Sequence, residues 1–218
     1  TGHGKSTTLA AIVQAINLER TEKIITIEDP IEYLFTPERS IIDQREVGTD
    51  THSFADALRA TFRENVNVIM VGELRDYDTI SAAVTAAETG HLVLGSIHTN
   101  DAPQTIERIL DIFPPNQQRQ ITSQLANTLS GVVSQRLIPA IRGGLMPAVE
   151  LMVANTAVRN IIREGKIEQL GIAIGTGAGA GMLSLNQSLA GLVRNQSISL
   201  EQAQFYSPNV NELQTLLK

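Results

Sequence analysis

The sequence predicts an α/β protein in which a mainly parallel sheet is flanked by helices. Residues 24–27 and 66–71 form apolar, largely β-branched runs, which suit strands buried on both faces, and acidic residues follow each run. Residues 9–16 carry apolar side chains at i, i+3, i+4 and i+7, the stripe of an amphipathic helix. From about residue 155 the pattern turns helical. We therefore expect a core over residues 1–154 and a C-terminal helical subdomain over 155–218.

Composition narrows the functional class. The 218 residues include 17 Lys and Arg against 23 Asp and Glu, a net charge of −6, and no cysteine. This balance argues against nucleic acid as a partner held by a basic surface. Disulfides, thiolate metal sites and cysteine nucleophiles are excluded. No apolar run approaches the ~18 residues of a membrane span, and no signal peptide is visible, so we expect a soluble, cytoplasmic protein.

The amino terminus carries a phosphate-binding motif. Gly4-Lys5-Ser6 matches the second half of G-x-x-x-x-G-K-[ST], and a helix that begins near Lys5 would point its free N–H groups at a phosphate. Lys5 would reach the β- and γ-phosphates of ATP, and the Ser6 hydroxyl would ligate Mg²⁺. The first glycine of the loop and the strand that feeds it are missing, so we expect a fragment of a longer protein. The residues that we predict to bind the nucleotide are Gly2, His3, Gly4, Lys5, Ser6 and Thr7.

Carboxylates follow both predicted strands. Residues 28–32 read Glu-Asp-Pro-Ile-Glu, and Glu73 follows the second strand after a glycine. Open α/β sheets bind ligands at the carboxyl ends of their strands, so one acid in 28–32 is expected to polarise the attacking water. A hydrophobic strand that ends in an acid is also the pattern of a Walker B strand, whose carboxylate holds Mg²⁺ through water.

A further strand is predicted over residues 91–99, with a histidine near each end. His98 could donate a hydrogen bond to a γ-phosphate and report whether ATP or ADP is bound, whereas His91 is expected to be structural or to lie in an interface. The glycine-rich residues 175–181 are interpreted as a flexible connector. They follow a helical pattern and lack the acidic residue that a dinucleotide-binding loop requires.

Four motifs together resemble the PilT family of type IV pilus retraction ATPases. They are the phosphate loop at residues 2–7, an Asp box at 27–32, a Walker B segment at 71–76 and a His box at 86–99. The resemblance implies a P-loop, RecA-like NTPase core. It also implies an ATP-driven homo-hexamer on the cytoplasmic face of the inner membrane, peripheral to it, that works with a pilus platform protein of that membrane. Relatives carry a separate N-terminal domain, which we expect to be absent from this chain.

The resemblance assigns roles by position. Lys5 and Ser6 bind phosphate and Mg²⁺, Glu73 is the second metal-site residue, and His98 senses the γ-phosphate. Glu32 is the expected general base, and Glu28 and Asp29 stay open as alternatives. The predicted catalytic residues are therefore Glu32, Glu73 and His98, and the predicted metal ligands are Ser6 and Glu73. The candidates for arginines that reach a neighbouring subunit are Arg45, Arg59, Arg63 and Arg75.

Two features favour retraction over pilus extension or type II secretion. Many extension and secretion ATPases carry a four-cysteine zinc segment, which a chain without cysteine cannot form. Residues 157–164 are also close to the octet that marks retraction ATPases, with departures at Val158 and Ile161. An extension or secretion ATPase is the alternative within the family. Two alternatives lie outside the family. One is a ring ATPase that acts on DNA, which the content of only 4% aromatic residues disfavours. The other is a non-catalytic nucleotide-binding scaffold.

Overall fold

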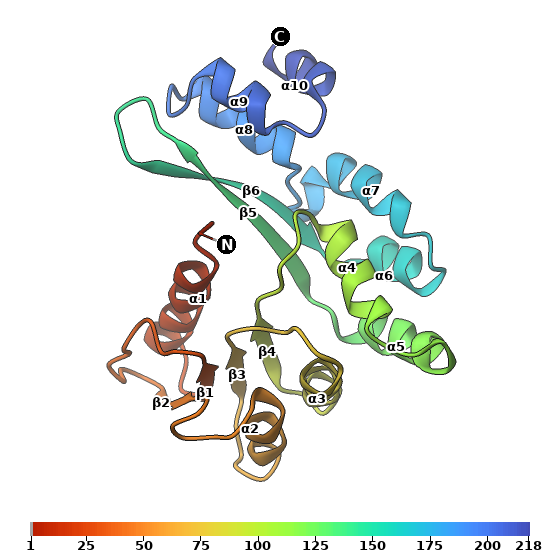
Figure 1. Cartoon of the computed structure of the whole chain (residues 1–218). Coiled ribbons are helices and arrows are strands. Elements are labelled where there is room, and N and C mark those ends of the chain that lie inside the picture. Colours follow the sequence, from red (N-terminus) through yellow and green to blue (C-terminus); the bar gives the residue numbers. More distant parts are fainter. Residues whose placement is uncertain (1) are drawn as a thin grey trace. The chain divides into compact units, whose positions relative to one another are not determined.

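The computed structural model describes residues 2–218. These residues fold into two compact units, each built from more than one stretch of chain (Figure 1). The first, which we call the sheet unit, holds residues 5–98 and 112–114. The second, which we call the hairpin unit, holds residues 2–4, 99–111 and 115–218.

The sheet unit is a four-stranded parallel sheet with helices on both faces. The strand order is β2-β1-β3-β4, and every neighbouring pair runs parallel. The predicted α/β fold with a mainly parallel sheet is thereby confirmed. The elements of this unit are α1 (Lys5–Glu19), β1 (Lys23–Glu28), β2 (Ile41–Glu46), α2 (Phe54–Thr61), β3 (Val68–Val71), α3 (Tyr77–Glu88) and β4 (Leu92–Gly95).

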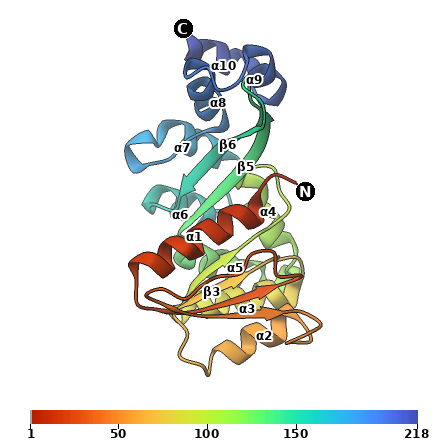
Figure 2. The same cartoon turned by 90° about the vertical axis from the view of Figure 1, so that its left-hand side faces the viewer.

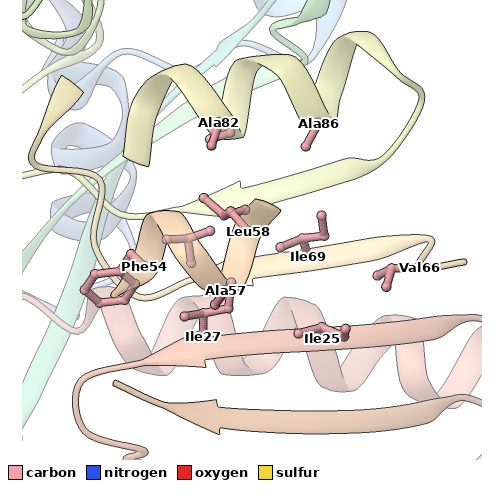
Figure 3. Packing of buried hydrophobic residues seen from close by; sticks show 11 residues of the cluster. Ile25, Ile27, Phe54, Ala57, Leu58, Val66, Ile69, Ala82 and Ala86 are labelled. Atoms are coloured by element: carbon pink, nitrogen blue, oxygen red, sulfur yellow. The ribbon is translucent and has the colours of Figure 1, made fainter. Parts of the chain in front are cut away.

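Alternate residues of the central strands pack on opposite faces of the sheet, as the two-residue period of a strand requires. Ile25 and Ile27 of β1 pack with Leu58 of α2 in a buried cluster that α3 also lines (Figure 3). Ile24 of the same strand packs with Val13 of α1 in a separate cluster. The helix that begins at the phosphate loop thus covers one face of the sheet, and α2 and α3 cover the other (Figure 2).

The hairpin unit is built around a long antiparallel pair of strands. β5 (Gly131–Pro139) and β6 (Leu145–Val153) pair along their whole length, from Gly131 opposite Val153 to Pro139 opposite Leu145. Ile138 and Ala148 of the hairpin pack with the last three helices in one buried cluster. The helices of this unit are α4 (Ala102–Asp111), α5 (Pro115–Thr128), α6 (Thr156–Arg163), α7 (Leu170–Thr176), α8 (Leu185–Arg194), α9 (Leu200–Tyr206) and α10 (Val210–Leu217), with short 3₁₀ turns at Ile167–Gln169 and Ala178–Ala180.

Several local predictions need correction. The strand expected over residues 91–99 ends at Gly95, so His98 lies in the segment that follows β4. The expected flexible connector at 175–181 includes the last turn of α7 and a 3₁₀ turn. Residues 41–46 and 77–88 form β2 and α3, which hydrophobic periodicity does not predict. β2 has apolar residues only at its start, and α3 buries mostly alanine and threonine.

The packing groups residues 99–111 and 115–154 with residues 155–218, whereas the sequence suggests a division after residue 154. Because packing units and functional domains need not coincide, the division at 154/155 stays a prediction. Among residues 2–218, no helix combines the length and the apolar character that a membrane span requires.

Candidate active site

The start of α1 is hydrogen-bonded to the loop that follows β1. The Ser6 hydroxyl donates to Oε1 of Glu32 over 2.9 Å. One residue further along both segments, Oγ1 of Thr7 lies 2.8 Å from the hydroxyl of Tyr33, and either group can donate. Two consecutive residues of the phosphate-binding helix are therefore paired with two consecutive residues of the predicted Asp box. The second pair was not anticipated from sequence, although Tyr33 directly follows Glu32.

Lys5, His98 and Glu73 form a chain of polar contacts. Nζ of Lys5 lies 2.9 Å from Nδ1 of His98 and donates to the carbonyl oxygen of Ile97 over 3.2 Å. Nε2 of His98 lies 3.4 Å from Oε1 of Glu73. An ammonium group can only donate, so Nδ1 of His98 is the acceptor and Nε2 carries the ring proton toward Glu73.

The Lys5 ammonium is partly desolvated. Burial lowers the pKa of Lys5, because a charged amine is less favourable away from water, and the nearby Glu73 carboxylate offsets part of this effect. A lysine that is partly withdrawn from water can bind an anion more strongly than one at an open surface, because its charge is less screened there.

The position of Glu73 is set by its two neighbours in the chain. Ser96, just after β4, donates its hydroxyl to the carbonyl oxygen of Gly72 over 2.6 Å, and its own carbonyl accepts from the N–H of Leu74 over 2.8 Å. Gly95 makes room for the Leu74 side chain, since a Cβ at position 95 would lie 2.6 Å from Cδ1 of Leu74. The end of β4 therefore fixes the backbone on both sides of Glu73.

The three acids of the predicted Asp box occupy different environments. Glu28 is only 7% exposed, and its Oε1 accepts from the Thr26 hydroxyl over 2.7 Å and from Nε2 of Gln44 over 3.2 Å. Asp29 is exposed. Glu32 is exposed and contacts Ser6. Of the three carboxylates, Glu32 is thus the one with a hydrogen bond to a residue of the phosphate-binding motif.

Gly2, His3 and Gly4 belong to the hairpin unit. Gly2 and Gly4 have φ angles of 79° and 78°, in the left-handed region that glycine adopts most easily. The carbonyl oxygen of His3 accepts from Nε2 of Gln135 over 2.8 Å, and a Cβ on Gly4 would lie 2.8 Å from the same Nε2. Close contact with β5 is a second reason for glycine at position 4.

The predicted metal-site residues offer the ligand atoms that Mg²⁺ prefers. Ser6 supplies a hydroxyl and Glu73 a carboxylate, and both are hard oxygen ligands. Within residues 2–218, no cluster of three or more His, Cys, Asp or Glu side chains could hold a metal ion. A site of this kind suits Mg²⁺, which is commonly held by one or two protein oxygens together with substrate phosphates and water.

Two further sequence candidates have local partners. His91 lies with Nδ1 2.9 Å from the carbonyl oxygen of Ala86, near the end of α3, which is a structural position. Arg45 makes a two-pronged contact with the Glu64 carboxylate, at 2.9 Å and 2.6 Å, and this hydrogen bonding raises the pKa of Arg45. Arg45 is therefore engaged by a carboxylate of the same chain.

Residues 157–164, the octet that suggests retraction, include most of α6. Nη1 of Arg159 donates to the carbonyl oxygens of Ala126 and Asn127 over 2.7 Å and 2.6 Å, at the end of α5. Val158 and Ile162 are buried. Part of the octet thus serves to join two helices of the hairpin unit.

Known proteins resemble this chain along nearly all of its length. A family model described as type II/IV secretion system protein matches residues 1–196. The type IV pilus retraction ATPase PilT of Pseudomonas aeruginosa is 47% identical over 203 residues, which are 93% of this chain and 59% of that protein. The type IV pilus assembly ATPase TfpB of Acinetobacter baylyi is 43% identical over 139 residues, or 63% of this chain and 22% of that protein.

The fold has a close counterpart among solved structures. A crystal structure of the pilus retraction motor PilT with bound ADP superposes on this chain with a TM-score of 0.89 and a sequence identity of 51%. The match covers 98% of this chain and 61% of the PilT chain. The chain thus spans somewhat over half the length of these two PilT proteins. The RecA-like secretion ATPase fold is confirmed, and the chain belongs to the type II/IV secretion system protein family.

Proposed function

We propose that this chain is the ATP-hydrolysing part of a hexameric motor that powers type IV pilus retraction. One observation carries the proposal. The side chains of Lys5, Ser6, Glu32, Glu73 and His98 come from four separate segments and meet in paired contacts at the start of α1. A lysine, a hydroxyl and carboxylates are groups that phosphoryl transfer from ATP uses, and a histidine adds a further hydrogen-bond donor.

Each side chain has a distinct role in the proposed reaction. Lys5 neutralises charge on the β- and γ-phosphates, and Ser6 and Glu73 would hold Mg²⁺, which when bound screens the phosphate oxygens. Glu32 accepts a proton from the attacking water as its oxygen bonds to the γ-phosphorus. The bond from the γ-phosphorus to the bridging oxygen breaks, leaving ADP and phosphate. Nε2–H of His98, which faces Glu73 over 3.4 Å in the structure, would donate to a γ-phosphate oxygen instead.

The assembly and its location rest on the family resemblance. We infer a homo-hexamer on the cytoplasmic face of the inner membrane, peripheral to it, with a platform protein of that membrane as partner and no role for nucleic acid. The core at residues 1–154 and the helical subdomain at 155–218 are proposed as its functional parts.

Retraction is favoured over assembly by the extent of similarity. The retraction relative matches 93% of the chain, whereas the assembly relative matches 63%. The octet at residues 157–164 supports the same choice. A pilus extension or type II secretion ATPase remains the second candidate.

Nucleotide binding tests the first step of the proposal. The protein to use is the chain joined to the amino-terminal domain and complete phosphate loop that the family resemblance implies, which we call the extended chain. Lys5→Ala should weaken ADP binding at least about 10-fold, since it removes a charge-assisted contact. Ser6→Ala should reduce the gain in affinity that Mg²⁺ gives. Lys166→Ala is the control, because Lys166 is exposed and forms an ion pair with the exposed Glu164.

Retraction itself is tested in cells. The extended chain would be expressed in a piliated bacterium that lacks its retraction ATPase, and labelled pili would be followed by fluorescence microscopy. Restored shortening of pili is the expected result. Restored pilus assembly in a strain that lacks its assembly ATPase, without any effect on shortening, would favour the second candidate instead.

A further inference from the structure

Strand β2 directs two polar side chains toward the loop that carries Glu32. Gln44 and Glu46 are two residues apart on this strand and so share one of its faces. Their partners in the parallel register with β1 are Thr26 and Glu28. These four polar residues lie on the face of the sheet that α1 covers, the same face to which Ile24 belongs. Polar side chains on this otherwise apolar face of the sheet need hydrogen-bond partners.

The Gln44 side chain uses its hydrogen-bonding capacity on the segment around Glu32. Its Oε1 accepts from the N–H of Phe35 over 2.9 Å. Its Nε2 donates to the carbonyl oxygen of Tyr33 over 2.8 Å and to Oε1 of Glu28 over 3.2 Å. Both amide hydrogens are thus engaged, one on the residue next to Glu32 in the chain and one on the buried carboxylate at the end of β1.

Glu46 holds the other side of the same loop. Its Oε2 accepts from the N–H of Ile31 over 2.9 Å. The backbone is therefore fixed one residue before Glu32 by Glu46 and one residue after it by Gln44. A carboxylate that accepts from a backbone N–H forms a charge-assisted hydrogen bond, which is stronger than a neutral one.

Apolar packing contributes little to the placement of this loop. Leu34 is 87% exposed, Tyr33 is 41% exposed, and Phe35 packs only in part against the α1 side of the sheet. A loop without a buried anchor takes its position from hydrogen bonds. Here the side chains of β2 hold the loop backbone, and Ser6 and Thr7 of α1 contact the side chains of Glu32 and Tyr33.

We propose that Gln44 is a positioning residue that sets the place of the Glu32 carboxylate for catalysis, with Glu46 as a second anchor. The inference rests on the proposed function, in which Glu32 is the general base. Gln44 acts through the backbone of residues 31–35 and does not itself contact the nucleotide. A general base must lie within hydrogen-bond reach of the water it activates, so a shift of about 1 Å lowers the rate strongly.

Gln44→Met in the extended chain is the direct test, since methionine keeps the length of the side chain and removes its three hydrogen bonds. We expect kcat for ATP hydrolysis to fall about 10- to 100-fold while KM for ATP changes less than about 2-fold, because Lys5 and Ser6 stay in place. Gln120→Met makes the same substitution on an exposed position of α5 and should leave both constants unchanged.

If Gln44 acts through Glu32, the losses of kcat caused by substitutions at these two residues should not be additive. In a Glu32→Gln background, Gln44→Met should cause no further loss of kcat, because the group that it positions is already disabled. An equal fold-loss in both backgrounds would overturn the proposal, and so would a raised KM with unchanged kcat. If Gln44→Met does not fold, Gln44→Asn, which keeps the amide on a shorter stem, should lower kcat in the same non-additive way.

Hydrogen exchange separates this proposal from the proposed function. Loss of Gln44 should speed amide exchange in the peptide spanning residues 31–36 about 10-fold, whether or not ATP is hydrolysed. An active parent protein with unchanged exchange in Gln44→Met would overturn the positioning role alone. An inactive parent with faster exchange would overturn the ATPase proposal and leave Gln44 as the anchor of this loop.

Discussion

Nζ of Lys5 lies 2.9 Å from Nδ1 of His98, and the other ring nitrogen of His98 lies 3.4 Å from Glu73. One imidazole thus connects the lysine that we predict to bind phosphate with the predicted metal-site acid. The Lys5 ammonium has three donors, of which His98 and the Ile97 carbonyl oxygen take two, so a phosphate that binds more than one donor would compete with the His98 ring. Turnover and nucleotide affinity are therefore linked through this ring.

Removal of the ring should affect these two properties in opposite directions. In His98→Ala this competing acceptor is gone, and a hydrogen bond to it is worth about 0.5–1.5 kcal/mol. ADP should bind about 2- to 10-fold more tightly, as isothermal titration would measure, while ATP hydrolysis slows. His91→Ala is the control, since its contact at the end of α3 affects stability alone. Weaker ADP binding by His98→Ala would contradict this account.

The pair formed by Thr7 and Tyr33 should show measurable coupling. Tyr33→Phe and Thr7→Val each remove one hydroxyl of the 2.8 Å contact. Each should lower the free energy of unfolding by about 0.5–1 kcal/mol, the net worth of a partly exposed hydrogen bond. In urea denaturation the double variant should lose no more than either single variant. Additive losses would mean that the two hydroxyls do not interact.

Gly95→Ala tests how β4 places Glu73. The new Cβ would lie 2.6 Å from the Leu74 side chain, and displacing that side chain should cost about 1–3 kcal/mol of stability. ATP hydrolysis should also slow, because Leu74 follows Glu73 directly. Gly191→Ala, on α8 with open space around its Cβ, is the matched control and should be neutral or stabilising by up to about 1 kcal/mol. Combining Gly95→Ala with Leu74→Ala should restore part of the lost activity. If the double variant regains no activity, the loss does not arise from the contact between positions 95 and 74.

The ion pair between Arg45 and Glu64 predicts a pH dependence of stability. Hydrogen bonds from Arg45 lower the pKa of Glu64 below its ordinary value of 4.5. A lowered pKa in the folded state means that the pair stabilises the fold above about pH 4.5 and loses this contribution as the pH falls through the folded-state pKa. Glu64→Gln should cost about 1–2 kcal/mol at neutral pH. This difference should shrink toward zero in acid. A difference that does not depend on pH would exclude the ionic explanation.

The parts of the fold that the sequence predicts are those with bulky periodic side chains. Leu9, Val13 and Ile16 mark α1, and the runs at 24–27 and 66–71 fall on β1 and β3. Strand β2 escapes prediction because Asp43–Glu46 are all polar, and their roles depend on a loop distant in sequence. The predicted length of the third strand was wrong because its apolar pattern continues past the last paired residue, Gly95.

Some residues of the candidate site can likewise be identified from the sequence, and others cannot. Motif spacing identifies Lys5, Ser6, Glu32, Glu73 and His98, and the structure brings them into contact, although their catalytic roles stay predictions. Spacing does not identify Gln44 or Tyr33. Their signal is the two-residue alternation of β2 and the pairing register with β1, which only the folded chain defines.

ATP hydrolysis by the extended chain, measured beside Glu32→Gln and Glu73→Gln, is the first test of the proposed ATPase activity. We expect the parent protein to turn over ATP in the presence of Mg²⁺ and each variant to lose at least about 100-fold in kcat, since each removes a base or a metal-site carboxylate. Undiminished hydrolysis by Glu32→Gln would transfer the role of base to Glu28 or Asp29. An assembled parent protein that binds ATP and never hydrolyses it would contradict the motor function.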